Sequence, residues 1–239
     1  MNSFLQEGTV VLVHGAWADG SCWQNIILPL RRLGLKVTCA PLPLTSLTDD
    51  VAALQRVLER TTGPVVLTGH AYAGAVIAAA SQDRVKSLVY VAALAPDEGE
   101  TVADVFYSAD PHPDAPHLTP DAQGFIWMPE DGFGSAVAHK ASPDQATILA
   151  AVQRPIALKC IQEKAPAPAW RTKPSWFLLA EEDRMISPET QRFMAERMSA
   201  TIRSYEVDHS PMLTDPDLVV NVILEALRET VSPTAVSVG

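Results

Sequence analysis

The chain has 239 residues, of which 47% are hydrophobic and 19% charged. This composition is typical of a globular protein and excludes a disordered one, and the length fits one domain with an insertion or at most two domains. The 28 acidic and 18 basic residues give a formal net charge of -10, which repels phosphate backbones and anionic lipid, so neither nucleic acid nor a membrane is an expected partner.

The first predicted strand, 10–13, is a continuously apolar run that leads directly into His14-Gly15-Ala16-Trp17. An H-G-x-x turn after the first strand supplies one backbone N–H of an oxyanion hole, and the second N–H comes from the residue that follows a nucleophile. The pattern therefore predicts that the amide of Ala16 is an oxyanion donor. The alternative for His14 is a structural histidine at the end of a strand.

Short β-branched runs and helical patterns alternate along the rest of the chain, which is typical of α/β proteins. Most strand runs are continuously apolar, as expected for parallel strands covered on both faces, whereas the second and the last alternate and are expected nearer an edge. The further predicted strands are 35–39, 65–67, 85–91, 176–179 and 202–207. The predicted helices are 50–60, with Thr48 as a possible N-cap, 75–80, 189–198 and 218–227.

The third strand runs into Thr68-Gly69-His70-Ala71-Tyr72-Ala73-Gly74, followed by a helix of small residues. A strand, a sharp turn and a helix form the context of the nucleophile elbow G-x-S-x-G, in which the strained turn needs small neighbours on both sides. Gly69 and Ala73 meet that size requirement. The nucleophile position itself holds Ala71, and Tyr72 would provide the second oxyanion amide.

Residues 97–170 interrupt this alternation, because a strand–helix–strand crossover needs far fewer residues. The stretch is rich in proline and carries His112, His117, Trp127, Met128 and Phe133. We interpret it as an inserted cap over a core formed by residues 1–96 and 171–239. A loose proline-rich loop is the alternative.

Two further signals follow the late strands. Asp183 lies just past the strand at 176–179 and is preferred to Glu181 and Glu182 as the catalytic acid, while His209 precedes the last helix and would be the general base. The chain order of elbow, acid and histidine matches that of the α/β-hydrolases and differs from the chymotrypsin and subtilisin orders.

Together these motifs resemble the α/β-hydrolase superfamily over nearly the whole chain, with the greatest likeness to small bacterial hydrolases and to the plant methylesterase and hydroxynitrile lyase group. The resemblance rests on 13–17, the elbow, 94–100, 173–176 and 208–212. It implies an α/β-hydrolase fold, with a mostly parallel sheet of about six strands, helices on both faces and a cap. It also implies cleavage of a small ester. The hydroxynitrile lyases of that group carry a lysine just after the catalytic histidine; Ser210 stands there in this chain and favours the esterase side.

Ala71 departs from the family pattern, because a methyl group forms no acyl intermediate. Three hypotheses follow. The first is a serine-type esterase, acting on a small neutral ester or lactone, whose nucleophile has been replaced and whose hydrolysis is impaired. The second is a lyase or isomerase in which His209 and Asp183 act as a general base without a covalent step. The third is a non-catalytic protein that binds a small molecule.

Several expectations concern ligands and location. Trp17 and Trp127 are expected to line an apolar substrate pocket. Cys22, Cys39 and Cys160 fit neither a disulfide framework nor a zinc pattern, so no metal and no cofactor is expected. Residues 1–8 lack the features of a signal peptide and no apolar run approaches the ~20 residues of a membrane span, which favours a cytoplasmic protein. A homodimer is possible by analogy with similar folds.

Overall fold

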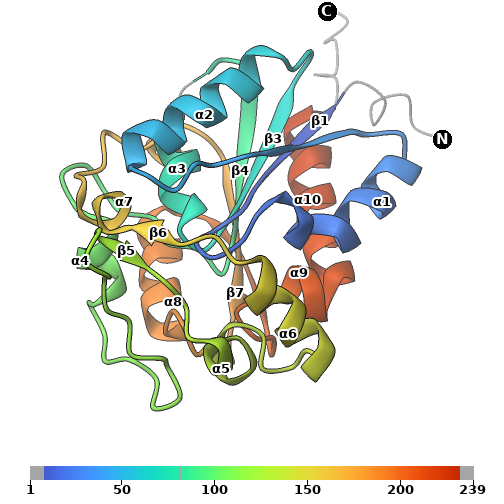
Figure 1. Ribbon diagram of the computed structural model, residues 1–239. Helices are drawn as coiled ribbons and strands as arrows, with labels where there is room; N and C mark the ends of the chain where they lie inside the picture. Colours follow the sequence, from blue (N-terminus) through green and yellow to red (C-terminus); the bar gives the residue numbers. More distant parts are fainter. Residues whose placement is uncertain (1–7, 81, 232–239) are drawn as a thin grey trace, which may run out of the picture.

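The computed structural model describes residues 8–80 and 82–231 (Figure 1). The prediction about a signal peptide concerns residues 1–8, of which all but Gly8 lie outside the described residues. Six strands form one parallel sheet in the order β2-β1-β3-β4-β7-β8. They are β1 (Thr9–Val13), β2 (Lys36–Ala40), β3 (Val65–His70), β4 (Val85–Val91), β7 (Ser175–Ala180) and β8 (Thr201–Tyr205). The predicted parallel sheet of about six strands is confirmed.

Burial of the strands follows their place in the sheet. Every residue of β1, β3 and β7 is buried, and β4 exposes only Lys86. The edge strands β2 and β8 mix exposed and half-buried residues instead. The distinction between continuously apolar and alternating runs therefore identified inner and edge strands correctly, because only inner parallel strands are covered on both faces.

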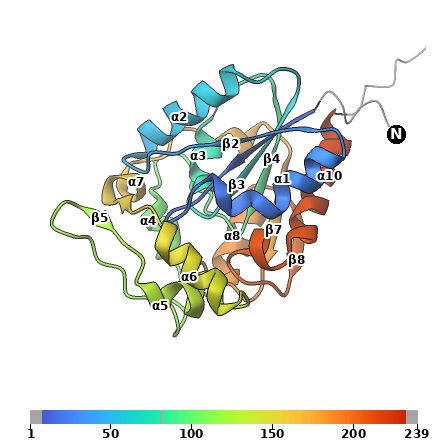
Figure 2. The ribbon, with the colours of Figure 1, turned by 45° about the vertical axis from the view of Figure 1, so that its right-hand side comes forward.

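Helices cover both faces of the sheet, as Figures 1 and 2 show. Helices α2 (Leu47–Glu59), α3 (Ala73–Ala79) and α8 (Pro188–Arg197) contribute buried residues to the apolar core on one face. Helices α1 (Gln24–Arg32) and α10 (Pro216–Val231) do the same on the other, where the short helices η2 (Gly20–Trp23) and α9 (Pro211–Thr214) also lie. Helix α3 approaches the chain that follows β4 closely at Gly74, where a Cβ would meet the carbonyl of Leu94.

The start of α2 differs from the sequence expectation. The helix begins at Leu47, and Ser46 rather than Thr48 is its N-cap, since the Ser46 side chain accepts a hydrogen bond from the amide of Asp49. A capping oxygen has to precede the first helical residue in order to reach the free amides of the first turn. Thr48 already lies inside that turn.

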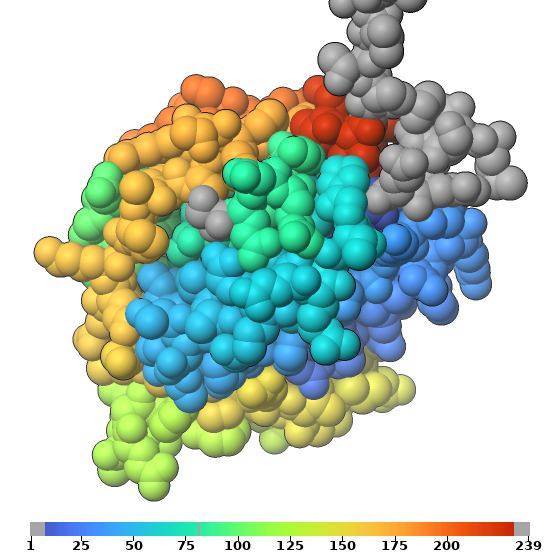
Figure 3. Space-filling view, turned by 90° about the horizontal axis from the view of Figure 1, so that it is seen from above, coloured from blue at the N-terminus to red at the C-terminus, as the bar shows by residue number. Residues whose placement is uncertain are grey.

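Residues 97–170 add no strand to the main sheet and gather beyond the carboxyl ends of its strands (Figure 1). They form a two-stranded antiparallel sheet of β5 (Phe125–Ile126) and β6 (Ile156–Ala157). They also form the short helices α4 (Val102–Phe106), α5 (Glu130–Gly132), η3 (Phe133–Val137), α6 (Pro143–Val152), α7 (Leu158–Gln162) and η4 (Ala169–Arg171). From the opposite end of the molecule these residues are visible only at the margin (Figure 3).

Candidate active site

A cavity opens where the carboxyl ends of the strands meet the inserted segment. Its core-side wall comes from the loops that follow β1, β3, β4, β7 and β8, and includes Ala16, Ala71, Leu94, Met185 and His209. The insert supplies the opposite wall with Val102, Phe106, Leu118, Ile126, Ile156 and Ile161. The space amounts to about 580 Å³ including its opening to solvent.

Ala71 occupies a strained turn at the bottom of this cavity. Its φ is 50°, in the left-handed region that costs a non-glycine residue roughly 1–2 kcal/mol, and it stands between the end of β3 and the start of α3. Gly74 permits the turn, because a Cβ there would lie 2.2 Å from the carbonyl oxygen of Leu94. This is the backbone geometry of a nucleophile elbow.

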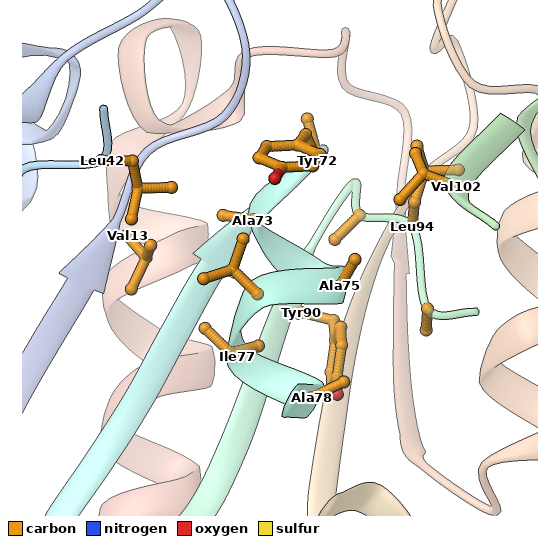
Figure 4. Close-up of a cluster of buried hydrophobic side chains, with 14 of the residues drawn as sticks. Val13, Leu42, Tyr72, Ala73, Ala75, Ile77, Ala78, Tyr90, Leu94 and Val102 are labelled. Atoms are coloured by element: carbon orange, nitrogen blue, oxygen red, sulfur yellow. The ribbon is translucent and has the colours of Figure 1, made fainter. Parts of the chain in front are cut away.

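Tyr72 lies at the top of α3, with Val13 and Leu42 on one side and Leu94 and Val102 on the other (Figure 4). Its hydroxyl donates to Oδ2 of Asp50 at 2.7 Å, and Asp50 is fully buried. Burial raises the pKa of the Asp50 carboxyl, and it also raises the pKa of the Tyr72 phenol. The buried pair thus anchors the residue whose amide follows Ala71.

His209 and Asp183 form a buried hydrogen-bonded pair. Nδ1 of His209 donates to Oδ2 of Asp183 at 2.7 Å, and both residues are at least 95% buried. Because a carboxylate only accepts, it holds the proton on Nδ1 and leaves Nε2 free to accept one. Glu181 and Glu182, the alternatives weighed for the acid, instead contact Arg192 and Lys140.

Three donors orient the Asp183 carboxylate. Its Oδ1 accepts from the amides of Met185 and Ile186, and its Oδ2 accepts from Nε2 of Gln191 as well as from the histidine. Gln191 is fully buried and also bonds the carbonyl of Ile186 and the amide of Ala180. Sequence inspection missed Gln191, because a glutamine on α8 looks like an ordinary helix residue.

The amides of Ala16 and Tyr72 bound the same cavity. Within residues 8–80 and 82–231, neither amide donates a hydrogen bond to a protein acceptor. Two free N–H groups beside an elbow are what an oxyanion hole requires. His14 shapes the turn that carries Ala16, because its Nδ1 donates to the carbonyl of Gly15 and its Nε2 accepts from the amide of Leu42.

The family model for the alpha/beta hydrolase family matches residues 10–222. The chain belongs to the alpha/beta hydrolase family. An alpha/beta hydrolase of Aspergillus novofumigatus is 24% identical over 93% of this chain and 97% of its own length. Methylesterase 2 of Arabidopsis thaliana is 26% identical over 90% of this chain and 94% of its own length. A solved structure of a polyneuridine aldehyde esterase mutant superimposes with a TM-score of 0.79 at 20% identity, covering 92% of this chain and 99% of the other.

The α/β-hydrolase fold thus brings together all the predicted site residues except one. Trp17 lines the cavity, and its indole N–H donates to the carbonyl of Ile126 at 3.0 Å. Trp127 does not line it: the side chain is 50% exposed and its indole N–H points to Asp121. Its neighbour Ile126, the last residue of β5, lines the cavity instead. Trp23 is fully buried in the core beside α1.

Two features are absent from the described residues. Nowhere in residues 8–80 and 82–231 do three or more His, Cys, Asp or Glu side chains gather in a way that could hold a metal ion. Among the same residues, no helix combines the length and apolar character needed to cross a lipid bilayer.

Proposed function

We propose that this esterase-like α/β-hydrolase binds a small neutral ester or lactone at a serine-type site in which Ala71 replaces the nucleophile and impairs hydrolysis. One observation carries the proposal: the strained Ala71 elbow, the His209–Asp183 pair and the free amides of Ala16 and Tyr72 all border one cavity.

The chemistry follows from that arrangement. With serine at the elbow, His209 would take the hydroxyl proton through Nε2, the oxygen would attack the ester carbonyl, and the two amides would hold the oxyanion. Asp183 would stabilise the imidazolium that forms. The methyl group of Ala71 provides neither the proton nor the attacking oxygen, and loss of a serine nucleophile lowers turnover by roughly six orders of magnitude.

The cavity wall supports a neutral and largely apolar substrate. None of the lining side chains is an acid, a lysine or an arginine. The side-chain polar atoms of Trp17 and Tyr72 are already bonded to Ile126 and Asp50. Apart from the two backbone amides, Tyr107 and His209, the wall therefore offers a substrate only apolar contacts, and a buried charge without a charged partner is costly in such a site. The substrate-binding roles we propose belong to Trp17 and to the apolar residues of the insert, which acts as a cap.

The experiment is Ala71→Ser, assayed with p-nitrophenyl acetate and with small aryl and aliphatic methyl esters. We expect hydrolysis to rise at least ~100-fold above the parent protein, because the base and the oxyanion donors are already in place. The matched control is Ala71→Ser combined with His209→Ala, which should return the rate to the parent level. A folded Ala71→Ser protein that hydrolyses none of these esters faster than the parent would contradict the proposal.

A second candidate, general-base chemistry without a covalent step, is favoured by the free Nε2 of His209. With no hydroxyl at position 71, that nitrogen faces the cavity and can take a proton from carbon next to a carbonyl, whose enolate the amides of Ala16 and Tyr72 would stabilise. Exchange of the α-protons of a small methyl ketone in D2O tests it, with His209→Ala as the comparison. Equal exchange rates for the two proteins would reject this candidate.

A further inference from the structure

One short stretch of the insert contacts both loops that carry the His209–Asp183 pair. We infer that residues 135–140, here called the clasp, hold these two loops in register, and that Asp208 is a positioning residue for His209. The role of His209 is taken from the proposed function. The contacts themselves depend on no catalytic assignment.

The clasp bonds the residues on either side of Asp183. Arg184 donates from Nη1 to the carbonyl of Ser135 at 2.9 Å and also pairs with Asp114 of the insert at 3.0 Å. On the other side, Nζ of Lys140 lies 2.7 Å from Oε2 of Glu182. The loop that carries Asp183 therefore contacts the insert through the residue before Asp183 and through the residue after it.

The same lysine reaches the loop that carries the histidine. The backbone amide of Lys140 donates to Oδ2 of Asp208 at 3.0 Å, and its Nζ donates to the carbonyl of Glu206 at 2.5 Å. Asp208 is fully buried, so its bond to the Lys140 amide is shielded from competing water, whereas the bond from Nζ of Lys140 to Glu206 is exposed. Lys140 is the point at which the two loops and the insert meet.

Asp208 passes this restraint on to His209. While its Oδ2 faces the clasp, its Oδ1 accepts from the amide of Ser210 at 3.1 Å and from the hydroxyl of Thr214 at 2.8 Å. One carboxylate therefore joins the clasp to the residue after His209 and to α9. On the opposite side His70 donates from Nε2 to the carbonyl of His209 at 2.7 Å, so the histidine backbone is held from two directions.

The consequence concerns the hydrogen bond between His209 and Asp183. Backbone bonds from Glu181 to Tyr205 and from Glu182 to Val207 already join the two loops where they leave the strands. The clasp adds a second attachment beyond those bonds, nearer the imidazole. If it opens, the Nδ1 proton of His209 becomes accessible to water more often, because exchange of a buried proton follows local opening.

The test is to measure by NMR how fast the Nδ1 proton of His209 exchanges with solvent, in the full chain with Ala71 unchanged. Asp208→Asn keeps one carbonyl oxygen but adds an NH2 group, so it cannot satisfy both the clasp and Ser210. Lys140→Ala removes the ammonium group and leaves the backbone amide. Loss of the buried Asp208 bond should speed exchange of this proton about fivefold in Asp208→Asn. The increase should be smaller in Lys140→Ala, because the ammonium bonds that it removes are exposed.

The control is Lys159→Ala, which removes an exposed ion pair with Glu163 on α7, elsewhere in the insert. It should leave the exchange rate unchanged, because exposed pairs contribute little. Unchanged exchange in both Asp208→Asn and Lys140→Ala, with the fold retained by circular dichroism, would overturn the inference. In the Ala71→Ser background we expect the clasp variants to lower kcat and leave KM nearly unchanged. If Ala71→Ser itself is inactive, the exchange rates still decide the question.

Discussion

Replacing Gln191 with leucine tests how much the buried amide of Gln191 contributes to stability around Asp183, the proposed catalytic acid. The fully buried Gln191 side chain makes three hydrogen bonds: to Asp183 at 2.8 Å, to the carbonyl of Ile186 at 2.9 Å and from the amide of Ala180 at 3.1 Å. Leucine has a similar size, so packing changes little. The carbonyl of Ile186 and the amide of Ala180 would then be buried without these hydrogen-bond partners, and each unpaired group costs about 1–3 kcal/mol of stability. We expect the free energy of unfolding to fall by about 3 kcal/mol.

Urea denaturation at pH 7 measures this loss, and thermal unfolding should show a Tm lower by about 6–12 °C for a chain of this size. The matched control is Gln82→Leu, which removes a bond between two side chains, to Gln55, and should change stability by less than about 0.5 kcal/mol. The reasoning would be refuted by a Gln191→Leu protein within about 1 kcal/mol of the parent. In the Ala71→Ser background, Gln191→Leu should also slow ester hydrolysis, because Asp183 would lose one of its orienting donors.

The remaining predictions concern buried histidines and the elbow. Burial lowers the pKa of His14 and, more strongly, that of His70. Both side chains therefore stay neutral in the folded protein when the pH falls below about 6.5, the pKa of a histidine in the unfolded chain. The unfolded chain takes up protons there and the folded protein does not, so the free energy of unfolding is highest above about pH 6.5 and falls below it. Urea denaturation at pH 7.5, 6.5 and 5.5 should show a loss of about 1–2 kcal/mol over the last step, and a flat profile would contradict neutral burial. Gly74→Ala should prevent folding or severely destabilise the fold, since the added methyl group would meet the Leu94 carbonyl. Far-UV circular dichroism and thermal unfolding measure this effect. A variant with the spectrum and the Tm of the parent would show that the fold does not need a glycine at this position.

The order of the elements and the position of the strained turn could be predicted from the sequence, because each depends on local pattern. Apolar continuity separated inner from edge strands, and small residues around position 71 indicated the elbow. All three acids Glu181, Glu182 and Asp183 follow the strand, and Asp183 was preferred among them as the candidate acid. The structure brings that carboxylate within 2.7 Å of Nδ1 of His209, whereas the two glutamates bind basic side chains elsewhere.

What the sequence left open depends on contacts between distant segments. Trp127 looked like a pocket residue by its type, but it follows the end of β5 and its indole N–H points to Asp121, away from the cavity. Asp208 seemed no more than the neighbour of a histidine, because its partner Lys140 lies 68 positions away. The support of a site by buried side chains becomes visible only when the tertiary fold is known.

The turn at residue 71 is fixed entirely by main-chain atoms. The amide of Ala71 donates to Val91, and its carbonyl accepts from the amides of Gly74 and Leu94. None of these bonds uses the side chain, and the tight clearance is imposed by Gly74. Shape and reactivity are therefore separate properties at this position: a hydroxyl, a methyl group or a hydrogen atom could occupy it on the same scaffold, and the choice among them decides the chemistry while the architecture stays the same.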